Sequence, residues 1–205
     1  MNGRVPSTLV TSLLLVRHGQ SEWNAAGRWQ GRADPPLTDL GRDNAVLAGR
    51  SGHLGVFDAV VSSPLERALD TAVTLADAIG VGPVLTDADL MERDAGPWQG
   101  LTRVEIEEGW PGMLDSGRRP DGHERDDALL TRVTASLSRL EARSGDGTVL
   151  VVTHAGVIYS LEASCGEPWV RLSNLGGRWL EFRDGRVSLG PRVELVEDAP
   201  VPDLL

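Results

Sequence analysis

Two short apolar runs are the strongest pattern in this chain, and a histidine follows each of them. Residues 13–16 read Leu-Leu-Leu-Val, and residues 149–152 read Val-Leu-Val-Val. Runs of branched apolar residues without helical spacing predict buried strands, the first over about 12–17. His18 and His154 then follow the carboxyl ends of two strands. Because ligands bind at that edge of open α/β sheets, the pattern predicts one site that contains both histidines.

The polar positions between these runs predict where helices begin. Thr38 is placed to cap a helix that ends near Gly52. Residues 63–66 (Ser-Pro-Leu-Glu) have the spacing of a capping box with proline at the first helical position, which predicts a helix from there to Gly80. Further elements are predicted as a short strand over 58–62, a helix over 124–143 and a helix that follows His154.

A hairpin is predicted near the C-terminus, because Asp184 and Gly185 separate apolar residues at 179–182 from those at 187–189. Strands that alternate with helices indicate an α/β fold with three layers, α/β/α, around a mostly parallel mixed sheet with an antiparallel edge strand. A length of 205 residues predicts one domain over 1–205. We expect loose tails at 1–10 and 196–205.

The charged residues limit the reactions and the binding partners that are possible for this protein. All 20 basic residues are arginine, so no lysine can form a Schiff base or bind a phosphate in a P-loop. Each cationic contact is therefore a planar guanidinium, which is suited to phosphate or carboxylate. The net charge is −10 without any basic tract, and this argues against a nucleic-acid partner.

Composition also predicts where the protein is found. No apolar stretch approaches the ~18 residues of a membrane span. The mostly apolar segment over 9–16 is interrupted by Thr11 and Ser12 and ended by Arg17, and no small-residue cleavage site follows it, so we do not expect a signal peptide. The single Cys165 cannot form an internal disulfide, which fits a reducing compartment, and we expect it to be a small core residue. We therefore expect a cytoplasmic protein without a membrane partner. The sequence leaves the oligomeric state open, a homodimer included.

Four separated polar motifs carry a family resemblance. They are RHGQSEWN at 17–24, continued by RWQG at 28–31 and LTDLGR at 37–42; SSPLERA at 62–68; ERDAGPWQGLT at 92–102; and THAGVI at 153–158. In this order, over about 12–182, they resemble the histidine phosphatase superfamily of phosphoglycerate mutase-like enzymes, and within it the small phosphatases of branch 1.

The chemistry of these residue types agrees with that resemblance. Attack on phosphorus needs a nucleophile that is unprotonated near neutral pH, which imidazole provides. Transfer of a phosphoryl group depends mainly on positioning and charge stabilisation, so Arg17 and Arg67 are the expected clamps. The resemblance implies that His18 is the phosphorylated nucleophile, that a protonated His154 contacts the phosphate, and that Glu92 is the general acid. Asp89 and Asp94 are close enough in sequence to share or take the role of Glu92.

The resemblance also implies a set of substrate-binding residues and a reaction without a metal or cofactor. Asn24 and the turn at Gln30 and Gly31 would add neutral contacts to the phosphate, and the substrate-binding set also includes Arg103 and Ala155. No zinc-type HExxH or cysteine motif is present. We therefore expect a small-molecule phosphate ester as the partner and no resident cofactor.

The family divides by the fate of the phosphohistidine. The stretch 93–153 is short, and 96–102 resembles phosphatases, whereas Arg103 and the pair Arg118-Arg119 resemble residues of mutases. We expect a metal-independent phosphomonoesterase of the histidine acid phosphatase type, acting through a phosphohistidine on a small metabolite such as a sugar or glycerate phosphate. The alternatives are a cofactor-dependent phosphoglycerate mutase and a non-catalytic module that binds phosphate esters or phosphoproteins. His123 departs from the pattern of many relatives, which leaves its role open.

Overall fold

One mixed sheet organises the part of the chain that the structure, a computed structural model, describes, residues 10–197. Its strands are β1 (Thr11–Arg17), β2 (Ala59–Ser62), β3 (Leu85–Thr86), β4 (Thr148–Thr153), β5 (Gly176–Arg183) and β6 (Arg186–Glu194). Their order across the sheet is β3-β2-β4-β1-β5-β6. The pairings among β1 to β4 are parallel, whereas β5 pairs antiparallel with both β1 and β6. The mixed sheet is confirmed, and its antiparallel edge has two strands.

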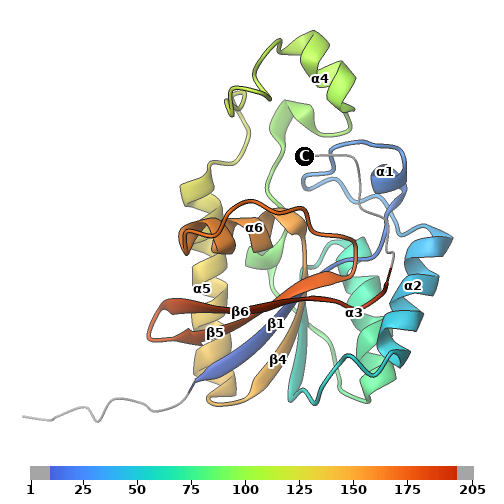
Figure 1. Cartoon of the computed structure of the whole chain (residues 1–205), viewed down its shortest axis with the longest axis vertical. Coiled ribbons are helices and arrows are strands. Elements are labelled where there is room, and N and C mark those ends of the chain that lie inside the picture. The colour runs from blue at the N-terminus through green and yellow to red at the C-terminus, as the bar shows by residue number, and fades with distance from the viewer. Residues whose placement is uncertain (1–9, 198–205) are drawn as a thin grey trace, which may run out of the picture.

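Helices cover both faces of this sheet (Figure 1). They are α1 (Glu22–Ala25), α2 (Asp39–Arg50), α3 (Glu66–Ile79), α4 (Arg103–Gly109), α5 (Asp126–Ser144) and α6 (Ala155–Ser164), with short 3₁₀ turns at Ala88–Leu90 and Gly96–Trp98. Leu13 and Leu15 of β1 pack in a core with α5 and α6, whereas Leu14 and Val16 pack in a core with α2 and α3. Successive side chains of a strand point to opposite faces, so a continuous apolar run fits a strand that is buried on both sides. The three-layer α/β/α prediction is confirmed.

The predicted helix starts have mixed outcomes. Thr38 caps α2 as expected, since its hydroxyl accepts a hydrogen bond of 2.9 Å from the amide of Gly41. The predicted capping box at Ser63 is wrong: α3 begins at Glu66, and its N-cap residue makes no side-chain cap bond. The hydroxyl of Ser63 lies 2.8 Å from Nε2 of His154 instead. The carboxylate of Asp34 accepts the amide of Glu66 at 2.8 Å, so a distant loop caps this helix.

The C-terminal elements follow the predicted order. The hairpin turns at Asp184 and Gly185, both with positive φ (49° and 75°), as a two-residue turn of this kind requires. The helix predicted from residue 124 begins at Asp126. The expectation of a buried Cys165 is wrong, because the thiol is exposed just beyond α6.

The predicted tails, 1–10 and 196–205, fall almost entirely outside the described residues. At their inner boundary, the side chain of Val196 packs partly buried against the core beneath α2 and α3. No helix of the described chain is both long enough and apolar enough to cross a membrane.

Candidate active site

The two histidines meet at the carboxyl ends of adjacent parallel strands, as predicted. The strands β1 and β4 pair in register, with Arg17 opposite Thr153. The amide of His18 donates to the carbonyl of Thr153 at 3.0 Å. The rings of His18 and His154 have centroids 5.2 Å apart, in an edge-to-face arrangement. Both rings are buried. They lie side by side because β1 and β4 are paired in register.

The hydrogen bonds of His18 define which ring nitrogen carries its lone pair. Its Nδ1 lies 2.6 Å from the carbonyl of Gly19, which can only accept, so Nδ1 is the protonated nitrogen. Its Nε2 then accepts a hydrogen bond of 3.2 Å from Nε of Arg67. Burial lowers the pKa of His18 well below 6.5, and the charges of Arg67 and Arg17 lower it further. The imidazole is therefore neutral near neutral pH, with its lone pair on Nε2.

Arg67 is held by backbone carbonyls rather than by a close carboxylate. It lies in the first turn of α3, fully buried, and donates to the carbonyls of Ala33 at 2.7 Å and Gly31 at 2.9 Å. The carboxylate of Asp34 is 3.7 Å away. Burial lowers the pKa of Arg67 to about 10, so the guanidinium keeps its charge at neutral pH.

Two further polar atoms are buried at this edge of the sheet. Arg17 donates to the carbonyl of Leu172 at 2.6 Å, while its Nε has no hydrogen-bond partner among the described residues. The same holds for Nδ1 of His154. Buried polar atoms without a partner are uncommon in native proteins and mark places where a ligand can bind.

The surroundings of His154 disfavour the protonated state that the resemblance implies. Its Nε2 is 2.8 Å from the Ser63 hydroxyl. Burial lowers the pKa of His154 well below 6.5, and the neighbouring Arg67, His18 and Arg17 act in the same direction. This structure therefore favours the neutral ring. A phosphate dianion placed beside it would have the opposite effect, because an anion favours the protonated form.

Glu92 is the candidate acid that the structure brings to this edge. Its carboxylate accepts the amide of Gly156, in the first turn of α6, at 3.2 Å and the amide of Arg93 at 2.7 Å. Asp89 is instead paired with Arg139, and Asp94 accepts a backbone amide at 2.9 Å. Of these three carboxylates, only Glu92 lines the cavity next to His18. The geometry therefore favours Glu92 over Asp89 and Asp94 as the general acid.

A cavity of about 440 Å³ opens over His18. Arg17, His18 and Glu92 line it. All five residues predicted to bind substrate line it too, namely Asn24, Gln30, Gly31, Arg103 and Ala155. Arg67 and His154 lie behind this wall, where they contact His18. The structure thus brings every predicted site residue to one place.

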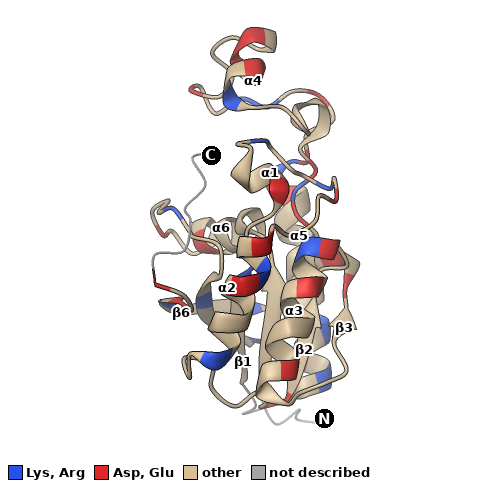
Figure 2. Cartoon of the chain, turned by 90° about the vertical axis from the view of Figure 1, so that its right-hand side faces the viewer, with Lys and Arg blue, Asp and Glu red and all other residues tan. Residues whose placement is uncertain are grey.

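The other lining residues lie outside the predicted catalytic and substrate-binding sets. They are Arg28, Trp29, Arg93, Ala95, Leu114, Gly117, Arg119, His123, Asp126, Gly156, Tyr159 and Trp169. Five arginines line the cavity, but three of them are ion-paired, Arg28 with Glu105, Arg93 with Asp126 and Arg103 with Asp115. The protein as a whole is acidic, with acidic positions spread over α2, α3 and α4 (Figure 2). Arg17 and Arg119 make no such ion pair within residues 10–197, so these two supply the positive charge that favours an anionic ligand in the cavity.

Arg119 and His123 come from a loop without periodicity, and both rest on one buried aromatic ring. The guanidinium of Arg119 is 5.3 Å from the ring of Trp98, and the His123 ring is 5.7 Å from it.

Asn174 holds the backbone of His18 and the side chain of Asn24 in place. It donates to the carbonyl of His18 at 3.0 Å and to Asn24 at 3.2 Å.

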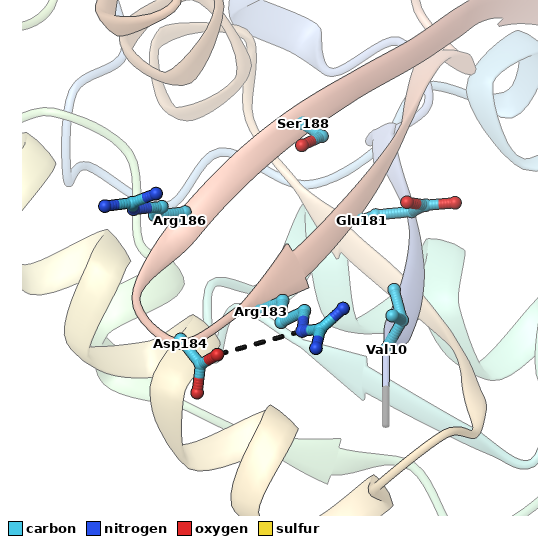
Figure 3. A pocket seen from close by; sticks show the side chains of 6 residues that line it. All are labelled: Val10, Glu181, Arg183, Asp184, Arg186 and Ser188. Atoms are coloured by element: carbon cyan, nitrogen blue, oxygen red, sulfur yellow. Dashed lines mark ion pairs between the residues drawn. The ribbon is translucent and has the colours of Figure 1, made fainter. Parts of the chain in front are cut away.

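A second cavity, of about 580 Å³, lies at the opposite end of the sheet. Figure 3 shows its wall under the β5–β6 turn, where Arg183 and Asp184 form an ion pair of 3.7 Å. None of the predicted site residues lines it. Among residues 10–197, no three His, Cys, Asp or Glu side chains are grouped as a metal site would need.

Comparisons with known proteins agree with this geometry. A bifunctional protein of Mycobacterium tuberculosis is 42% identical over 157 residues, which cover 74% of this chain but only 43% of that protein. The glucosyl-3-phosphoglycerate phosphatase of Mycolicibacterium vanbaalenii is 36% identical over 190 residues, 84% of each chain. Among solved structures, a mycobacterial glucosyl-3-phosphoglycerate phosphatase in complex with VO₃ superposes with a TM-score of 0.77, at 30% identity, over 88% of this chain and 97% of the other.

The family model for branch 1 of the histidine phosphatase superfamily matches residues 13–188. This range contains all the motifs on which the resemblance was based and both histidines of the site. The chain belongs to branch 1 of the histidine phosphatase superfamily.

Proposed function

We propose that this protein is a metal-independent phosphomonoesterase that acts through a phosphohistidine on a small phosphorylated metabolite. The observation that carries the proposal is the neutral His18, whose lone pair lies on Nε2 within 3.2 Å of the Arg67 guanidinium. In the first step Nε2 attacks phosphorus, an N–P bond forms, and the P–O bond to the alcohol breaks. Glu92 gives a proton to the departing oxygen.

Charge stabilisation in this step comes from groups that are already in place. Arg17 and Arg67 are buried beside His18, and because a guanidinium keeps its charge at neutral pH, both stabilise the negative charge of the phosphoryl oxygens. Ala155 lies at the first position of α6, where the positive helix end favours an anion, although the amide of the next residue, Gly156, already donates to Glu92. His154 gains a proton as the phosphate binds and becomes a further donor.

The second step returns the enzyme to its starting state. Water attacks the phosphohistidine, Glu92 in its carboxylate form accepts the proton, and the N–P bond breaks to release phosphate. The reaction is that of a phosphoric monoester hydrolase of the histidine acid phosphatase type. The similarity to glucosyl-3-phosphoglycerate phosphatases supports a sugar or glycerate phosphate as the substrate.

A cofactor-dependent mutase is the second candidate, and one observation favours it. Arg103, which resembles a mutase position, lines the cavity together with Arg119. Such a pair suits a substrate carboxylate held bidentately.

Phosphate release from a panel of sugar, glycerate and nucleoside monophosphates, with a metal chelator present, tests the proposal. The expected result is release that survives the chelator and is lost in His18→Ala. Transfer between glycerate positions with a bisphosphoglycerate primer, without net release of phosphate, would favour the mutase. Tight binding of phosphate without either reaction would favour a non-catalytic module.

A further inference from the structure

Trp169 lies in the wall of the cavity that His18 lines, and more than half of its side chain is exposed to solvent. Its side chain is 57% exposed, whereas Trp29, Leu114 and Tyr159 in the same wall are only partly exposed. A large aromatic side chain left open to water loses the favourable free energy of burial, about 25 cal/mol for each Å² of apolar surface. An exposed indole in the wall of a small-molecule cavity therefore offers a ligand a flat apolar face.

The segment that carries Trp169 is tied to the phosphate end of the cavity. Leu172, three residues further on, donates its amide to the Tyr159 hydroxyl at 2.8 Å and accepts Arg17 on its carbonyl at 2.6 Å. The Trp169 and Tyr159 rings are in contact, with centroids 5.8 Å apart. Trp169 is thus placed relative to Arg17 through two hydrogen bonds and one ring contact.

The cavity has room for more than a phosphoryl group. Its volume of about 440 Å³ lies within the range of about 300–1,000 Å³ that is typical of small-molecule sites. With the phosphoryl group on His18 and Arg17, the alcohol part of the ester occupies the remaining space. The wall around that space holds charged side chains and the indole of Trp169.

We propose that Trp169 determines specificity by stacking on a ring in the alcohol part of the substrate. This inference rests on the proposed phosphatase function and narrows its substrate class to esters of ring-bearing alcohols, in the first place sugars, over open-chain glycerol or glycerate esters. A sugar ring presents the C–H groups of one face to an indole and buries apolar surface there, whereas an open-chain glycerol or glycerate ester offers less such surface.

The test compares kcat/KM for glucose phosphate, adenosine monophosphate and glycerol phosphate in three variants. Trp169→Ala removes the ring, Trp169→Phe keeps an aromatic face, and Val170→Ala is the matched control, since Val170 is similarly exposed (52%) but does not line the cavity. For Trp169→Ala we expect kcat/KM for glucose phosphate to fall about three- to tenfold, mainly through KM, with little change for glycerol phosphate. Trp169→Phe is expected to retain most of the preference, and Val170→Ala all of it.

Equal losses on glucose phosphate and glycerol phosphate, no loss on either, or a Trp169→Phe as impaired as Trp169→Ala would overturn the inference. A loss on adenosine monophosphate alone would also overturn the assignment to sugars and point to a nucleoside. Wild-type enzyme that releases phosphate from these esters without any preference for a ring would end this inference but leave the proposed function intact. No release by the wild type from any ester would remove both.

Discussion

Nε of Arg67 donates a hydrogen bond to Nε2 of His18 over 3.2 Å. The other two nitrogens of the same guanidinium bind backbone carbonyls of the loop before α2, so the arginine has little freedom to move. The proposed nucleophilic atom and the proposed clamp are therefore in direct contact before any substrate binds. This preorganisation is the basis of the first prediction.

Replacing Arg67 by lysine is expected to lower kcat about 10²- to 10³-fold, because the planar fork is lost although the charge remains. The measurement is steady-state hydrolysis of a phosphate ester, with the circular dichroism spectrum as a check of folding. Arg50→Gln, at the exposed end of α2, serves as the control and is expected to keep wild-type activity. A fully active Arg67→Lys would contradict the role given to the guanidinium.

Replacing Glu92 by glutamine is expected to affect substrates according to their leaving group. Hydrolysis of an alkyl phosphate should slow by about 10²- to 10⁴-fold, whereas p-nitrophenyl phosphate, whose leaving group needs no proton, should be affected far less. The two rates are measured side by side at one pH. Asp89→Asn is the matched control, since Asp89 lies outside the cavity and pairs with Arg139. Equal slowing of both esters would assign the proton to another group.

Gly156→Ala is expected to reproduce the effect of losing Glu92 while every proposed catalytic side chain is retained. A Cβ at this position would clash with Oε1 of Glu92, so the carboxylate must move. Because the atom it meets is the end of a flexible side chain, the fold should survive. The rate on alkyl phosphates is expected to fall more than the rate on p-nitrophenyl phosphate. Gly109→Ala, where a Cβ meets nothing within 4 Å, is the control.

Stability is expected to fall as the pH falls through about 6.5. Burial holds the pKa values of His18 and His154 well below 6.5 in the folded protein, while in the unfolded chain they are about 6.5. Below about pH 6.5 the unfolded state therefore binds protons that the folded state does not, which lowers the free energy of unfolding by about 1.4 kcal/mol per pH unit for each histidine.

Urea unfolding between about pH 8 and about pH 5 measures this slope, in a range where carboxylates contribute little. The double variant His18→Gln/His154→Gln should show a shallower slope than the wild type, and His53→Gln, at an exposed position, should not. A wild-type stability that increased towards pH 5 would contradict the buried, neutral histidines.

The sheet and the core of the site could be predicted from sequence because both depend on short local patterns. The two apolar runs specified β1 and β4, and the parallel pairing of these strands then brought His18 and His154 together. The wrong capping box at Ser63 shows where local patterns fail. That hydroxyl is used by His154, and Asp34, from a distant loop, caps α3 instead.

The outer wall of the cavity could not be predicted in the same way. Arg119, His123 and Trp169 lie in loops, where no periodicity indicates which side chains face a cavity. Arg118 and Arg119 are adjacent and chemically identical, yet only Arg119 lines the wall. Such differences depend on contacts between distant segments, here with the buried Trp98.

The phosphohistidine at His18 can be tested directly by trapping the phosphorylated enzyme. Enzyme mixed with a phosphate ester is quenched, and the modified residue is identified by peptide mass spectrometry, with His18→Ala as the control. If His18 is the nucleophile, it carries an acid-labile, base-stable phosphate that is absent in the variant. A phosphate on serine, or one that persists in His18→Ala, would contradict this role of His18.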